Sequence, residues 1–264
     1  MWASAAAGTP GYGHGGDRGV VTQQDDAGAV WQSCVLSEPL PQFPLAQPHP
    51  LGWVVIGMRC RRGEQNAWLF DTSGQCRGSG RVGDGVEEAY TTHDGDLWVS
   101  YFDEGVFGDD DIAASGCVRW QVSGDEHGWC SFDPAWQLDY AEMADCYAMN
   151  VTDKTTYACP YTGFPVIVIK EGSTTVLPSR IEGPAALVTD GYRMAIIGSY
   201  RKRDAVAVGI LERDRFKLVK TVNLAIDERD WTKIQFAGRG DRLHAFGADG
   251  RWWSTTLDEL CETR

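Results

Sequence analysis

The feature that most constrains this chain is a recurring pattern of short candidate β-strands. From about residue 29 onward, runs rich in β-branched and aromatic residues are separated by glycine, aspartate or proline, which is typical of successive antiparallel strands. Five similar units follow one another. The second strand of each unit begins near residue 53, 97, 156, 192 or 243, so the spacings are 44, 59, 36 and 51 residues. A repeat of this length predicts small sheets that pack in series.

A single unit of this kind cannot cover both of its faces, whereas four-stranded sheets stacked radially around an axis cover one another. The repeat therefore predicts an all-β fold, a β-propeller of about five four-stranded blades, with six blades still open and a β-sandwich as the alternative. The last unit shows only three strands before Arg264. An N-terminal strand near residues 29–35 is expected to pair with it, because closure hides an exposed sheet edge.

The first 28 residues differ in composition from the rest of the chain. They have almost no periodic apolar residues, and their glycines are Gly8, Gly11, Gly13, Gly15, Gly16, Gly19 and Gly28. Such a segment gains too little burial to offset the entropy of ordering. We predict a disordered glycine-rich tail over residues 1–28 and a single β-propeller domain over residues 29–264.

Charge and hydropathy exclude several classes of partner. Lysine and arginine number 24 against 37 aspartates and glutamates, which gives a net charge of −13 and disfavours binding to nucleic acid. The longest apolar run, Leu51–Met58, is far shorter than the roughly 18 residues that span a bilayer. Residues 1–10 lack the charged and apolar regions of a secretory signal. We therefore expect a cytoplasmic monomer that does not associate with a membrane, and we expect its eight cysteines to be reduced thiols.

Three candidate ligand motifs lack the context that they need. Gly78–Gly83 matches the dinucleotide fingerprint without the strand and helix on either side. The acidic loop Asp103–Asp111 lacks the alternation of a calcium-binding loop. His127 could join Cys117 and Cys130 at a zinc ion, but no close cysteine pair supports this site. We predict no metal and no cofactor, and the catalytic residues, if any, are unknown at this stage.

One stretch suggests a family. The dodecapeptide Leu97–Gly108, preceded by Gly83-Asp-Gly85 and by Asn66-Ala-Trp68, resembles uncharacterised β-propeller proteins of actinobacteria. The resemblance covers about residues 50–255 and implies the propeller fold, but it brings no assigned activity, cofactor or catalytic residue. The chain departs from these proteins in its glycine-rich N-terminus.

The strand register predicts which loops share a surface. In a propeller, the loops that join second to third strands lie on the same face as the connections between blades. The predicted contact residues on that face are Arg59, Arg61, Tyr101, Asp103, Glu104, Tyr161, Tyr200, Arg201 and Arg203. Guanidinium groups bind carboxylates and phosphates through paired hydrogen bonds. We therefore predict a non-catalytic binding or scaffold propeller that recognises a protein or a small anionic ligand.

The alternative is a hydrolase or lyase at the mouth of the central channel. Asp103 or Glu104 would then act as general acid or base beside Tyr101, while arginines polarise a substrate anion. This chemistry needs burial that raises the pKa of one carboxyl group above that of its neighbour. Because propellers host both binding proteins and enzymes, the fold alone leaves the question of catalysis open. A deep pocket with converging side chains favours the enzyme, and a shallow surface favours the binding module.

Overall fold

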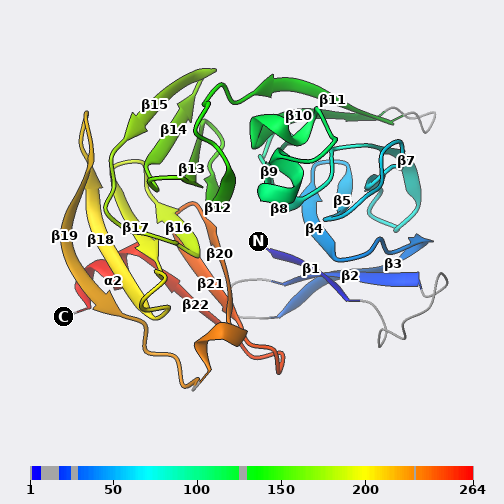
Figure 1. The fold of residues 1–264 in the computed structure, drawn as a ribbon. Helices are drawn as coiled ribbons and strands as arrows, with labels where there is room; N and C mark the ends of the chain where they lie inside the picture. The colour runs from blue at the N-terminus through cyan, green and yellow to red at the C-terminus, as the bar shows by residue number, and fades with distance from the viewer. Residues whose placement is uncertain (1, 7–17, 25–28, 125–129, 229, 264) are drawn as a thin grey trace. The chain divides into compact units, whose positions relative to one another are not determined.

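The structure is a computed structural model that describes residues 2–6, 18–24, 29–124, 130–228 and 230–263 (Figure 1). The protein is all-β with the β-propeller fold, so the predicted fold class is confirmed. The chain divides into two compact units, unit 1 over Met1–Ala141 and unit 2 over Glu142–Arg264. No helix within the described ranges is long and apolar enough to cross a bilayer.

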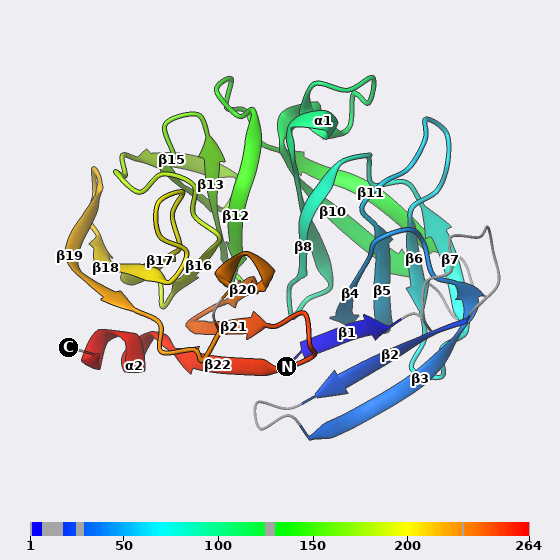
Figure 2. The ribbon, with the colours of Figure 1, turned by 60° about the horizontal axis from the view of Figure 1, so that its bottom comes forward.

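Unit 1 contains three antiparallel sheets in its described part. The first sheet has β1 (Trp2–Ala6), β2 (Arg18–Gln24) and β3 (Val30–Pro39), and the second has β4 (Pro44–His49), β5 (Gly52–Gly57), β6 (Ala67–Phe70) and β7 (Cys76–Gly80). The third has β8 (Val86–Thr91), β9 (Asp96–Tyr101), β10 (Cys117–Gly124) and β11 (Cys130–Gln137), with the short helices α1 (Asp103–Val106) and Ala113–Ser115 between β9 and β10. The first strands β1, β4 and β8 contact one another in sequence (Figure 2).

Unit 2 repeats this organisation with three further sheets. They comprise β12 (Asp145–Val151), β13 (Thr155–Tyr161), β14 (Val166–Lys170) and β15 (Ser173–Leu177), then β16 (Ala186–Thr189), β17 (Arg193–Ile197), β18 (Ala205–Leu211) and β19 (Phe216–Asn223). The last sheet has β20 (Gln235–Arg239), β21 (Arg242–Phe246) and β22 (Trp252–Thr256), preceded by a 3-10 turn at Trp231–Lys233 and followed by α2 (Leu257–Glu262). Strands β12, β16 and β20 again contact one another in sequence.

Burial follows the position of each strand within its sheet. Every residue of β5 is buried, whereas four of the five residues of the outer strand β15 are exposed. A middle strand is covered on both faces by neighbouring sheets, so it is apolar along its whole length, while an outer strand meets water. The five predicted units are thereby confirmed as five sheets, from β4–β7 to β20–β22, and the last has three strands as expected.

Each unit has a buried asparagine whose side chain links separate backbone segments. Asn66 Nδ2 donates to the carbonyl oxygens of Gly57 and Gly83 at 2.9 and 2.8 Å. Asn150 Nδ2 donates to the carbonyl oxygens of Leu187 and Gly240 at 2.7 and 3.0 Å, and its Oδ1 accepts from the Gly240 backbone nitrogen at 3.0 Å. These side chains satisfy backbone groups that would otherwise be buried without a partner. The first asparagine links loops of unit 1, and the second links three strand ends of unit 2.

The dinucleotide-like motif Gly78–Gly83 lies on β7 and the connection that follows it. A Cβ atom at Gly78 would approach the Cβ of Cys130 on β11 to 2.4 Å, and Gly78 also has a φ of +158°. Glycine at this position therefore permits two outer strands of unit 1 to pack closely.

The N-terminal predictions are partly wrong. Residues 2–6 and 18–24 form strands rather than a disordered tail, while residues 7–17 and 25–28 lie outside the described residues. The expected closing strand is part of β3, which pairs with β2 instead of the last sheet. The cause is apolar packing, because Val21 and Leu36 are fully buried against Val55 and Phe70 of the second sheet. The single-domain boundary over residues 29–264 stays a prediction.

Candidate functional site

The unit 1 loop surface consists of residues 58–66, 81–85 and 102–116. These segments lie at one end of unit 1, because their side chains contact one another. Arg59 Nε lies 3.1 Å from Asp84 Oδ1, and Arg59 Nη1 lies 2.5 Å from Glu104 Oε2. Within unit 1, the β5–β6 loop, the connection after β7 and the β9–β10 loop therefore share a surface, as the register predicted.

A second ion pair fixes the long β9–β10 loop. Asp110 is only 8% exposed, and its two oxygens accept from Arg81 Nη1 and Nη2 at 3.0 and 2.5 Å. Asp110 also accepts from the backbone nitrogens of Asp84 and Ile112 at 2.8 and 3.1 Å. A buried carboxylate with this many donors is structural, because it satisfies the guanidinium and two backbone groups at once.

The predicted contact residues of unit 1 differ in their surroundings. Arg59 packs its guanidinium carbon 5.5 Å from the Phe102 ring centre, and its hydrogen bonds to Asp84 raise its pKa further above the ordinary value. Asp103 Oδ1 accepts from the Glu104 backbone nitrogen at 2.8 Å. Arg61 is exposed and makes no ion pair with any described residue. Asp103 and Glu104 face water at the start of α1, so the burial that the enzyme hypothesis needs is not present.

Tyr101 does not belong to the contact set. Its side chain is fully buried, and its hydroxyl donates to the Val82 carbonyl oxygen. Burial raises the pKa of Tyr101 well above the ordinary value. The error arises because burial does not alternate along β9: all residues from Leu97 to Tyr101 are buried in this doubly covered strand. A residue placed at a strand end from sequence can thus belong to the core.

The unit 2 loop surface consists of residues 161–165 and 198–204 together with Tyr147, and it is aromatic. We define its aromatic cluster as Tyr147 on β12, Tyr161 at the end of β13, Phe164 in the β13–β14 loop and Tyr200 in the β17–β18 loop. Tyr147 meets Phe164 edge-on with ring centres 5.1 Å apart, and Tyr200 lies 5.6 Å from Phe164. Tyr161 lies 5.6 Å from Phe164. These edge-on and tilted arrangements are the favourable ones for aromatic rings.

Local contacts hold the cluster in place. The Tyr147 and Tyr200 hydroxyls share a hydrogen bond of 2.6 Å, and this bond is the largest cause of the raised Tyr147 pKa. The Tyr200 backbone nitrogen donates to the Glu182 carbonyl oxygen at 3.1 Å. Gly183 has a φ of +67°, and a Cβ there would lie 2.4 Å from the Tyr200 ring. The β15–β16 connection therefore packs against the Tyr200 ring, and glycine makes this close approach possible.

The aromatic cluster combines one buried ring with two exposed rings. Phe164 is only 4% exposed, whereas Tyr161 and Tyr200 are 44% and 57% exposed. Two large apolar rings thus face water beside a buried anchor. Such exposed aromatic groups, grouped rather than scattered, indicate a contact surface.

The cations beside the cluster are not neutralised in the described part of unit 2. Arg201 is exposed and makes no ion pair there, and Arg203 is half-buried with an Nε atom that has no hydrogen-bond partner. Lys202 differs, because its Nζ bonds to Asn223 Oδ1 at 2.8 Å and lies 3.8 Å from Asp204. Arg201 therefore remains available to a carboxylate, whereas the Arg203 Nε atom is buried without an acceptor in the described chain.

Sequence reasoning missed Tyr147 as a member of the site. The register of β12 against β13 shifts between Cys146 and Ala148, so Tyr147 occupies a β-bulge. A bulge re-aims a side chain out of the regular alternation. No pattern in the sequence marks this shift, and Tyr147 therefore looked like an ordinary residue of a first strand.

The structure also bears on the ligand motifs. No group of three or more His, Cys, Asp or Glu side chains in the described ranges is placed to hold a metal ion. The eight cysteines are free, and Cys117, Cys146 and Cys159 are buried. His127 lies outside the described residues.

Comparison with known proteins supports the fold. No protein-family model and no curated protein matches the chain. A protein of Lactobacillus plantarum superposes with a TM-score of 0.54 at 13% identity, over 96% of this chain and 81% of that one. A protein of Bacteroides fragilis superposes with a TM-score of 0.54 at 14% identity, over 98% and 79%. AztD of Citrobacter koseri matches with a TM-score of 0.48 at 10% identity, over 88% of this chain, which spans 61% of AztD.

At these identities the likeness shows the fold alone. The class that fold and surface define is a β-propeller with a charged loop surface in one unit and an aromatic loop surface in the other. Membership of the actinobacterial family stays a prediction.

Proposed function

We propose that this protein is a non-catalytic binding module that recognises a partner protein through the unit 2 loop surface. The observation that carries the proposal is the pair of exposed rings, Tyr161 and Tyr200, held on the buried anchor Phe164 beside an unpaired Arg201. A cytoplasmic location and a monomeric state remain predictions for this binding module.

The residue types support a protein partner. Tyrosine and arginine dominate the binding energy of protein interfaces, because they offer a large contact area together with a polar end. Packing within the cluster lowers the entropy that Tyr200 would lose on binding, since its ring and hydroxyl are already held. Arg201 and Arg203 favour a partner that presents carboxylates to this surface.

The charged surface of unit 1 supports catalysis less well. Glu104 is engaged by Arg59, Asp110 is engaged by Arg81, and the Tyr101 hydroxyl is bonded inside the core. These groups therefore do not converge on a position that a substrate could occupy. The hydrolase or lyase alternative has no specific contact in its favour among the described residues.

The test is a comparative affinity capture from a cell extract with quantitative mass spectrometry. The double variant Tyr161→Ser/Tyr200→Ser should reduce the recovery of specific partners by at least about tenfold, since interface tyrosines commonly contribute more than 1.4 kcal/mol. The matched control is Tyr192→Ser, which removes an equally exposed tyrosine (63%) from the β16–β17 turn at the other end of β17.

The control should recover the wild-type set of partners. Arg201→Glu should reduce recovery as well, through charge reversal. If the double variant and the control recover the same partners as the wild type, the proposed surface is wrong.

A further inference from the structure

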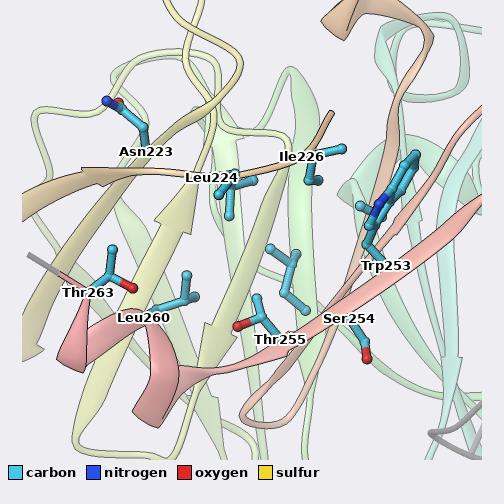
Figure 3. Close-up of a pocket in the computed structure, with 11 residues that line it drawn as sticks. Asn223, Leu224, Ile226, Trp253, Ser254, Thr255, Leu260 and Thr263 are labelled. Carbon is cyan, nitrogen blue, oxygen red and sulfur yellow. The ribbon is translucent and has the colours of Figure 1, made fainter. Parts of the chain in front are cut away.

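Unit 2 has a second feature, a largely apolar pocket beside its last sheet (Figure 3). Its volume is about 240 Å³. Its apolar lining comes from the segment after β19, from β21, from β22 and from α2: Leu224, Ala225, Ile226, Leu243, Ala245, Trp253 and Leu260. Asn223, Ser254, Thr255 and Thr263 add polar groups. The size suits one large apolar side chain, and the composition is that of a binding pocket.

The pocket adjoins an open strand edge. The last sheet has the order β20-β21-β22, and no described strand pairs with the outer side of β22. The other two sheets of unit 2 continue to a fourth strand, β15 or β19. Here the chain instead enters α2, because Thr256 and Glu259 form a reciprocal cap that starts the helix directly after the strand.

Hydrogen-bond alternation shows which groups of β22 face outward. The Arg251 carbonyl oxygen accepts from Gly247 at 2.8 Å, and the Leu257 nitrogen donates to Asp241 at 2.7 Å. Odd-numbered residues therefore bond toward β21, and the backbone groups of Trp252 and Ser254 point away from it. Within the described chain these outward groups make no backbone hydrogen bond. They offer two donors and two acceptors to an added strand.

The pocket reaches this open edge. Trp253 and Thr255 pair with Ala245 and Leu243 on β21, and all four line the pocket, so they share one face of the sheet. Ser254 lines it too, although its side chain points away from Leu224 and Ile226 (Figure 3). A strand added beside β22 would therefore place alternate side chains over the same face, next to the pocket.

The charge around the edge is negative. Residues 252–263 include Asp258, Glu259 and Glu262 and no lysine or arginine.

Asp258 is paired with Arg193, whereas Glu262 and Asp227 are exposed and make no ion pair with described residues. Two neighbouring cations are engaged: Arg251 pairs with Glu228 and Asp249, and Lys220 donates to the carbonyl oxygens of Cys261 in α2 and of Thr263 directly after it. Charge complementarity therefore favours a basic occupant.

We propose that an extended segment of a partner protein, carrying one large apolar side chain flanked by lysine or arginine, adds to β22 as a fourth strand. Backbone bonds to Trp252 and Ser254 provide affinity, and the pocket selects the apolar residue, as in other cases of strand addition. The site uses none of the residues of the unit 2 loop surface, so either proposal can fail without the other.

The test uses a phage library of random 12-residue peptides, selected on the full-length protein. We expect enrichment of extended peptides with one leucine-sized or aromatic residue between basic residues. An enriched peptide is then measured by fluorescence anisotropy. Ser254→Pro should weaken its binding by at least about tenfold, because proline removes an outward donor yet is tolerated on an edge strand.

Two further variants separate this effect from misfolding. Ser254→Ala keeps the backbone donor and should bind within about twofold of the wild type. Ala225→Phe fills the pocket without changing the backbone groups of β22 and should weaken binding by a similar factor to Ser254→Pro.

Several results would overturn the proposal. They are no enrichment, enrichment of acidic peptides, binding as tight as that of the wild type by the Ser254→Pro or the Ala225→Phe variant, or a wild-type dimer that Ser254→Pro abolishes. The last result would assign the edge to a second copy of this chain.

Discussion

The two loop surfaces are built from corresponding loops but use their polar residues differently. In unit 1, Arg59 and Arg81 are each paired with carboxylates, and the longest loop is held by the buried Asp110. In unit 2, the loops hold an aromatic cluster, and Arg201 and Arg203 have no ion pair in the described chain. The Arg59 and Arg81 ion pairs stabilise the loops of unit 1, where Arg61 remains unpaired among the described residues, whereas unit 2 presents an unpaired Arg201 beside exposed aromatic rings.

This difference shows why charge counts alone are a poor guide to a binding surface. Both surfaces contain arginines at corresponding loop positions, and the sequence shows them as similar. Exposed ion pairs contribute little to stability, but they occupy the charged groups that a ligand would need. We expect the effects of substitutions to range from a large loss of stability at Asp110 to a nearly neutral change at Glu104, both in unit 1.

The largest effect is expected for Asp110→Ala. The substitution leaves the Arg81 guanidinium and the Asp84 nitrogen without their acceptor in a mostly buried position. Removal of one partner from such a pair should lower the free energy of unfolding by about 3 kcal/mol. Urea denaturation checks this value. Asp109→Ala, at the exposed neighbouring position, should stay within about 0.5 kcal/mol of the wild type, and equal losses in both variants would contradict the structural role of Asp110.

A medium effect is expected for Tyr200→Phe, which removes only the hydroxyl that shares a hydrogen bond with the Tyr147 hydroxyl. The free energy of unfolding should fall by about 1 kcal/mol, the usual net value of one hydrogen bond. Because this bond is the main cause of the raised Tyr147 pKa, that pKa should move down toward its ordinary value. Spectrophotometric titration of tyrosinate measures the shift, and an unchanged titration curve would show that the two hydroxyls are not bonded.

The hydrogen-bonded pair of Tyr147 and Tyr200 predicts that the free energy of unfolding depends on pH. The Tyr147 pKa is higher in the folded state than in the unfolded chain. Its contribution to stability is therefore fully present below the unfolded value of about 10 and is lost as the pH rises above it. Denaturation at pH 9 and pH 11 should show a smaller loss for Tyr200→Phe than for the wild type. A larger loss in the variant would reverse the sign and contradict the assignment.

The smallest effect is expected for Glu104→Gln. Its partner Arg59 keeps Asp84 as a second acceptor, and the Glu104 side chain is 61% exposed. The free energy of unfolding should fall by less than about 1 kcal/mol, and recovery of partners should not change. Thermal denaturation and affinity capture together check this prediction. Loss of partners in Glu104→Gln would move the binding surface to unit 1.

Parts of this account could be predicted from sequence and parts could not. The strand pattern predicted the five repeated sheets, because alternation and turn residues are local signals. It also placed Arg59 and Glu104 in loops of one surface. It could not show that Tyr101 is buried or that Tyr147 occupies a bulge, because both depend on the register between strands. The sequence predicted a strand near residues 29–35 but not its partner over residues 18–24, because Val20 and Val21 are the only apolar residues of that partner and the burial of Val21 depends on tertiary contacts.

The most direct test compares the two loop surfaces against one captured partner. Surface plasmon resonance would measure its dissociation constant with Tyr161→Ser/Tyr200→Ser in unit 2 and with Arg61→Glu/Arg62→Glu in unit 1. We predict a dissociation constant at least about 30-fold larger for the tyrosine variant and within about twofold of the wild type for the arginine variant. A weakened arginine variant beside an unaffected tyrosine variant would contradict the account.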